Sequence, residues 1–116
     1  MPGYAVTKRD HSLDHLLDLH GLVLVVDEKG GHWVKFEVRQ VPVSADRPHG
    51  LNYSLTLHTA SGERLVGFDN AHSVKGSRDH RHHFTTVKPY AYSNAGTLLE
   101  DFWKAVDSVL QERGVI

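Results

Sequence analysis

A concentration of histidine is the feature of this sequence most suggestive of chemistry. The chain of 116 residues contains ten histidines, and four of them fall within twelve consecutive positions that begin at residue 72. Imidazole exchanges protons near neutral pH and also binds metal ions. If residues 79–86 form an extended strand, His80 and His82 point to one side, while Arg81 and His83 point to the other. The segment therefore suits an acid–base pair, a metal site or a polar loop without chemistry.

Carboxylates and cations flank these histidines. Asp69 and Asn70 end a predicted strand, and strand ends that lead into loops are frequent places for functional residues. Asp69 or Asp79 is able to orient an imidazole, as the third group of a catalytic triad does. Lys75 and Arg78 make the segment locally cationic.

Composition limits the class of protein. Apolar residues make up 40% of the chain and charged residues 23%, so we expect one globular domain over residues 1–116, with a frayed start at residues 1–9. The absence of cysteine excludes disulfides and thiolate chemistry. No signal peptide or membrane-spanning run is visible, so we expect a cytoplasmic protein with no membrane partner. A net charge of −1 argues against a generic nucleic-acid binder but allows a local basic patch.

The apolar pattern predicts several strands. Residues 22–27 are apolar on both sides, which is typical of a central or well-covered strand. Residues 32–41 and 51–59 alternate between apolar and polar side chains, and residues 64–70 form a fourth strand. The short turns between them predict an antiparallel meander, to which residues 79–86 add a short fifth strand.

Two helices complete the predicted fold. The leucine spacing after Ser12 predicts a short N-terminal helix that Ser12 caps. Beyond a connector at residues 89–92, residues 97–113 carry an apolar stripe of helical period, with Ser93 or Thr97 as the cap. We therefore expect an α+β fold, in which an antiparallel β-meander of four to five strands has a C-terminal helix packed on one face and a short N-terminal helix.

Alternation also assigns polar side chains to the sheet face that the C-terminal helix leaves open. The side chains expected on this face are Lys35, Glu37, Arg39, Asn52, Ser54, Thr56, His58 and Asp69. If His80 and His82 lie at this face or its edge, both fall within about 10 Å of Asp69, which is two strand spacings. A solvated surface is the plain alternative for the strand residues taken alone.

Several short motifs occur in an order that resembles a known family. They are Gly67-Phe68-Asp69-Asn70, Lys75-Gly76, Asp79-His80-Arg81-His82 and Leu98-Leu99-Glu100-Asp101-Phe102-Trp103, preceded by Pro48-His49-Gly50 and Tyr53-Ser54-Leu55. Over residues 21–109 the chain resembles the TumE-type toxin family of bacterial toxin–antitoxin systems. It departs from the family pattern at His72-Ser73-Val74 and at the inserted Ser77-Arg78. These changes bear on the role of Lys75 more than on that of His80 or His82.

The resemblance implies a toxin whose cognate antitoxin is a helix-turn-helix protein and whose expected target is RNA. We hypothesise a metal-independent endoribonuclease with no cofactor. RNA carries its own nucleophile, the 2′-hydroxyl, so the enzyme needs a base, an acid and a cation for the phosphate charge. His80 and His82 are the candidate base and acid, and Arg81 or Lys75 would stabilise the phosphate.

Two other functions stay open for the same residues. One is a metal-dependent nuclease or phosphoesterase, with Asp69, His80 and His82 as ligands. The other is a non-catalytic module that binds RNA or a partner protein, and a homodimer is left open in every case. The candidate residues divide into a catalytic set, His80, His82, Asp69, Arg81 and Asp79, and a substrate-binding set, Asn70, Lys75, Arg78, His83 and Arg39.

Overall fold

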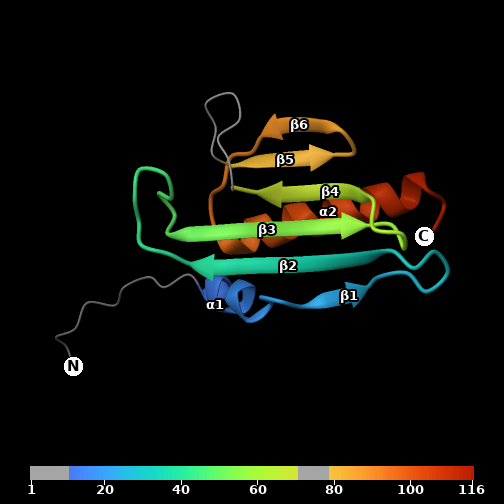
Figure 1. Ribbon diagram of the computed structural model, residues 1–116, viewed down its shortest axis with the longest axis horizontal. Coiled ribbons are helices and arrows are strands. Elements are labelled where there is room, and N and C mark those ends of the chain that lie inside the picture. The colour runs from blue at the N-terminus through green and yellow to red at the C-terminus, as the bar shows by residue number, and fades with distance from the viewer. Residues whose placement is uncertain (1–10, 71–78) are drawn as a thin grey trace.

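The computed structural model describes residues 11–70 and 79–116. Within these ranges two helices and six strands follow one another along the chain (Figure 1). In order they are α1 (His11–Asp18), β1 (Val23–Val25), β2 (Trp33–Gln40), β3 (Leu51–His58), β4 (Arg64–Asp69), β5 (His80–His83), β6 (Thr86–Pro89) and α2 (Ala95–Glu112).

The strands form one antiparallel meander in the order β1-β2-β3-β4-β5-β6. This confirms the α+β fold, with one strand more than the four to five predicted. The predicted fifth strand at residues 79–86 is in fact β5 plus a reversal, and β6 lies where part of a connector was expected. The reversal at Phe84 has a φ of 54°. Glycine usually takes such a position in a two-residue turn, so the sequence gave no turn signal there.

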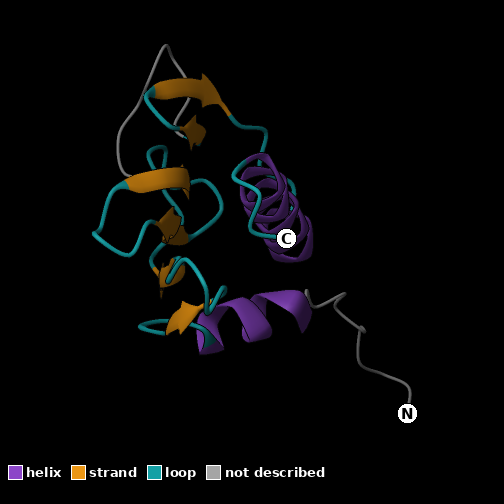
Figure 2. Ribbon diagram, turned by 90° about the vertical axis from the view of Figure 1, so that its right-hand side faces the viewer, coloured by secondary structure: helices purple, strands orange, loops and turns teal. Residues whose placement is uncertain are grey.

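Helix α2 covers one face of the sheet, and the view along the layers shows it standing beside the strands (Figure 2). Its predicted stripe is buried, because Leu98, Phe102, Val106 and Val109 are all at most 1% exposed. The ring of Phe102 meets Phe36 edge-on at a centroid distance of 5.6 Å. The core therefore lies between α2 and the apolar face of the sheet, and the opposite face is left for polar side chains.

The predicted helix caps were wrong by a few residues. Helix α2 begins at Ala95, and the N-cap is Asn94, whose Oδ1 accepts a hydrogen bond from the Thr97 N–H at 2.8 Å. Thr97 thus lies inside the first turn, and Asn is as good a cap as Ser or Thr. Ser12 also lies inside its helix, α1, rather than capping it.

Strand β1 corrects a second expectation. Residues 22–27 were expected to form a central or well-covered strand, but β1 is the first strand in the sheet order and has a neighbour on one side only. All three of its side chains are exposed, and Val25 is 64% exposed. An apolar run predicts a strand from local preference, whereas its place in the sheet depends on which strands pair with it.

Candidate functional site

Strands β4 and β5 bring one carboxylate and two imidazoles together on the polar face. Asp69 and His80 are direct cross-strand partners, and His82 lies opposite Gly67. The Nε2 atom of His80 is 2.6 Å from Asp69 Oδ1, and the Nε2 atom of His82 is 3.0 Å from Asp69 Oδ2. The two rings meet edge-on at a centroid distance of 5.1 Å. This confirms the expectation that both histidines reach Asp69, and we call these three residues the Asp69 cluster.

Gly67 leaves the space that the His82 ring needs. A Cβ atom at position 67 would lie 3.3 Å from Cδ2 of His82 and 3.4 Å from Cδ of Arg64, tighter than most such contacts. Glycine weakens a strand interior, and a glycine found there often marks a close approach. The glycine in the matched motif Gly67-Phe68-Asp69-Asn70 therefore has a local reason, because it lets His82 lie flat enough to reach Asp69.

The proton positions in the cluster follow from its hydrogen bonds. Arg64 places a guanidinium nitrogen 3.2 Å from His82 Nδ1. A guanidinium can only donate, so Nδ1 accepts and Nε2 carries the proton that His82 donates to Asp69. Partial burial, followed by the positive charge of Arg64, lowers the pKa of His82, while Asp69 acts in the opposite direction. His82 is therefore a neutral imidazole at physiological pH.

His80 is the deeply buried member of the cluster, with 3% of its surface exposed. Its Nδ1 atom is buried and has no hydrogen-bond partner among the described residues. Buried polar atoms in native proteins almost always have a partner. An unpartnered ring nitrogen beside a carboxylate is therefore a sign of a group kept for a proton or a ligand.

The Asp69 cluster also has the composition of a metal site. One ligand atom from each of Asp69, His80 and His82 lies within 4.8 Å of the others. Two ligands on a tetrahedral zinc ion are roughly 3.3 Å apart, close to the spacing of the nitrogen and oxygen atoms here. The residues thus fit either proton transfer or metal coordination.

Arg81 and His83 occupy the other face of β5, as the alternation predicts. The Arg81 guanidinium lies over the Phe68 ring, 4.8 Å from its centroid. His83 is half exposed, with Nε2 3.9 Å from Glu112 of α2. The structure therefore separates these two residues from the Asp69 cluster, so that Arg81 is turned away from a phosphate bound beside His82.

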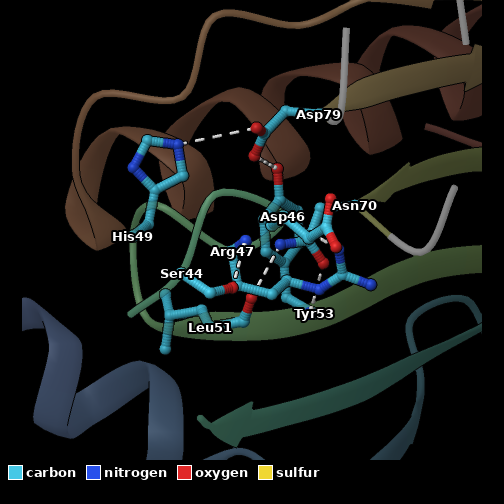
Figure 3. Close-up of polar contacts among 8 residues, drawn as sticks. All are labelled: Ser44, Asp46, Arg47, His49, Leu51, Tyr53, Asn70 and Asp79. Carbon is cyan, nitrogen blue, oxygen red and sulfur yellow. Dashed lines mark hydrogen bonds and ion pairs between the residues drawn. The ribbon is translucent and has the colours of Figure 1, made fainter. Parts of the chain in front are cut away.

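A second polar cluster, which the sequence-based residue sets missed in part, surrounds Asp79 (Figure 3). The Tyr53 hydroxyl donates to Asp79 Oδ2 at 2.7 Å, and His49 Nε2 lies 3.5 Å from Asp79 Oδ1. Burial and the adjacent carboxylate raise the pKa of Tyr53. The His49 ring stacks on Tyr92 at 4.2 Å. Asp79 thus orients His49 and Tyr53 rather than His80 or His82, and the only prior signal was the presence of both residues in the matched motifs.

Comparison with known proteins decides the family. The profile of a family described as toxin TumE matches residues 21–110. The chain belongs to the TumE toxin family. No curated protein and no solved structure gives a significant match. Membership in a toxin family implies an antitoxin as partner.

The TumE match contains both polar clusters. Strands β1 to β6 and most of α2 lie inside it, whereas α1 precedes it. No helix in the described parts of the chain is long and apolar enough to cross a bilayer.

The remaining predicted residues of this TumE toxin have separate fates. Asn70 is 2% exposed, and its side chain accepts from the Tyr53 N–H and donates to the Leu51 carbonyl, so it extends the β3–β4 pairing (Figure 3). Arg39 lines a cavity of about 510 Å³ on the polar face, together with Arg47. Lys75 and Arg78 lie outside the described residues.

A third carboxylate–imidazole pair lies at the turn between β1 and β2. His32 Nδ1 is 2.6 Å from Asp27 Oδ2, and Arg113 donates to His32 Nε2 at 3.1 Å. The backbone N–H of Gly30, and then His32, lower the pKa of Asp27. Both ring nitrogens of His32 are occupied, so this pair links the turn to the C-terminal end of α2.

Proposed function

We propose that this TumE-family toxin is an endoribonuclease whose reaction centre is the Asp69 cluster. The observation that supports this most is the contact of two imidazoles with the two oxygens of one carboxylate, on the polar face of the sheet. The cavity lined by Arg39 and Arg47 on the same face supplies positive charge for an RNA strand. The cognate antitoxin in this proposal is a helix-turn-helix protein, and both act in the cytoplasm.

His82 is the base in this mechanism. Its Nε2 proton is held by Asp69, so the lone pair on Nδ1 is free to take the proton of an RNA 2′-hydroxyl. Arg64, which lies beside Nδ1 in the absence of substrate, turns to the phosphate and stabilises its charge. The resulting 2′-oxygen attacks the adjacent phosphorus and displaces the 5′-oxygen.

His80 supplies the proton for the leaving 5′-oxygen. Its Nε2 atom is tied to Asp69, and its Nδ1 atom is without a partner among the described residues, so Nδ1 is the atom that faces the substrate. Because the ring is 3% exposed, this role requires the RNA to expose His80 as it binds.

A metal-dependent phosphoesterase is the second candidate, and the convergence of three ligand atoms within 4.8 Å favours it. In that case Asp69, His80 and His82 would hold the ion, and the ion would polarise the phosphate. The first test is cleavage of single-stranded RNA by purified toxin, with and without EDTA. Cleavage that survives EDTA supports the acid–base mechanism, and cleavage lost to EDTA and restored by a divalent metal supports the second candidate.

Two substitutions locate the reaction centre. We expect His82→Ala to abolish both cleavage and growth arrest, whereas His58→Ala, an imidazole on the same sheet that contacts Thr56, should leave them unchanged. Cleavage by the His82→Ala protein at the wild-type rate would refute both mechanisms, and RNA binding without cleavage by the wild-type protein would indicate a non-catalytic module.

A further inference from the structure

The face of β5 that points away from the Asp69 cluster forms a groove with α2 and β6. Two adjacent cavities, of about 240 Å³ and 350 Å³, share Arg81 and His83 as walls. Lys104 of α2 lines the first cavity and Lys88 of β6 lines the second. We call this feature the β5–α2 groove.

The charge of the β5–α2 groove is positive. Arg81, Lys88 and Lys104 contribute three permanent cations, and no ion pair involves either lysine within the described part of the chain. The one carboxylate among the lining residues is Asp101, and it accepts a hydrogen bond from the Tyr90 hydroxyl at 2.6 Å. Glu112 lies beyond the lining, near His83. The groove therefore attracts an anion along its length.

Arg81 is held so that its donors face the groove. Its guanidinium packs by its face on the Phe68 ring, with 4.8 Å to the centroid. Such a stack uses the face of the planar group and leaves its N–H edge free for a phosphate oxygen. The ring thus fixes the middle cation of the groove without neutralising it.

The lining of the groove favours a phosphate backbone over a protein segment. Thr86 and Ser108 add hydroxyl donors, and Ala105 is the only apolar residue of the lining. Protein partners are usually anchored by aromatic or large aliphatic side chains in apolar pockets. Phosphates require only cations and hydrogen-bond donors.

We infer that the β5–α2 groove binds the phosphate backbone of single-stranded RNA, on the opposite face of the hairpin from the reaction centre. This inference rests on the proposed function for the choice of ligand. Arg81 stands between His80 and His82 in β5, so one strand presents the reaction centre on one face and the groove on the other. An RNA strand that crosses the β6 edge contacts both, and the groove holds it while the Asp69 cluster acts.

The test measures RNA binding apart from cleavage. In the His82→Ala background, we expect Lys88→Gln with Lys104→Gln to weaken binding of a fluorescent oligouridine. Each lost phosphate contact reduces the slope of log affinity against log salt by about 0.7 for single strands, so the double variant should lose about 1.4 between roughly 50 and 200 mM salt. Lys29→Gln, at an exposed lysine in the turn after β1, is the control and should keep the parent slope.

The outcomes separate this inference from the proposed function. A parent slope in the double variant would overturn the groove, even if the wild-type toxin cleaves RNA. A reduced slope in a toxin that never cleaves RNA would support the groove and contradict the catalytic proposal. Loss of antitoxin binding in the double variant, with RNA affinity unchanged, would overturn the inference and make the groove a protein-docking surface.

Discussion

Asp69 carries one negative charge between two imidazoles, and each of its oxygens has a different histidine as partner. A carboxylate in this position fixes the proton of His82 on Nε2 and leaves Nδ1 as the basic atom. Charge and orientation are therefore supplied by the same residue, and removal of the charge should affect both histidines at once.

We expect Asp69→Asn to lower RNA cleavage by roughly a hundred- to ten-thousand-fold, the range of a general acid–base group. The amide is nearly the same size, but its nitrogen donates, so one imidazole loses its acceptor. Single-turnover cleavage and growth arrest would measure the effect. Asp107→Asn, at an exposed position of α2, is the matched control. Full activity of Asp69→Asn at every pH would exclude the orienting role.

The second residue-scale prediction concerns pH. Burial and Arg64 hold the pKa of His82 below its ordinary value of 6.5, so the neutral base persists as the pH falls past 6.5. We expect kcat/KM to stay level there and to decline only at a lower pH. The contribution of His82 to stability is likewise present above 6.5 and is lost as the pH falls toward the lowered pKa.

Arg64→Gln tests the cause of that shift. Without the guanidinium, the pKa of His82 should rise and the acid limb of the pH–rate profile should move to higher pH. NMR titration of the His82 ring reports the same change independently of cleavage. An unchanged ring titration in Arg64→Gln would show that Arg64 does not set the pKa.

Helix α2 and the central strands determine whether β4 and β5 stay in register. Phe102 of α2 meets Phe36 of β2 and Phe68 of β4 with its ring edge-on to each. Phe68 in turn supports the Arg81 guanidinium on β5. The core is thus connected to the groove through two aromatic rings.

Phe102→Ala should lower the free energy of unfolding by about 3–5 kcal/mol, because it leaves a cavity where a fully buried ring was. Urea denaturation measures the loss. Glu112→Ala, at a half-exposed position of the same helix, should change it by less than about 0.5 kcal/mol. A loss for Phe102→Ala as small as that of the control would mean that α2 does not close the core.

The whole molecule holds three carboxylate–imidazole pairs in different settings. Asp69 serves two histidines on the polar face, Asp79 serves His49 and Tyr53, and Asp27 serves His32. Only the Asp69 cluster combines two imidazoles with a ring nitrogen that lacks a partner among the described residues. The Asp27 pair instead connects the β1–β2 turn to the end of α2 through Arg113.

This contrast predicts different consequences for two histidine substitutions. His32→Ala should lower the urea midpoint, because it leaves Asp27 and Arg113 without their shared partner, while RNA cleavage by the folded protein stays at the wild-type rate. His15→Ala, at an exposed position of α1, should change neither quantity. A loss of cleavage in folded His32→Ala would indicate that the far end of the sheet takes part in the reaction.

The sequence by itself determined the features that follow from local backbone geometry. Side chains alternate along a strand, so His80 and His82 had to share one face and Arg81 and His83 the other. The 3.6-residue period placed Phe102 and Val106 on the buried side of α2. The proximity of Asp69 to both histidines followed from the same alternation once antiparallel pairing was assumed.

Only the tertiary structure decided which elements meet. The exposure of β1 depends on its place at the sheet edge, and the reversal at Phe84 lacks the glycine that would have marked it. Asp79 finds Tyr53 and His49, more than twenty residues away in sequence, because the strand order brings them together. Such contacts depend on strand order and register, which arise from packing over the whole chain and leave no short-range pattern in the sequence.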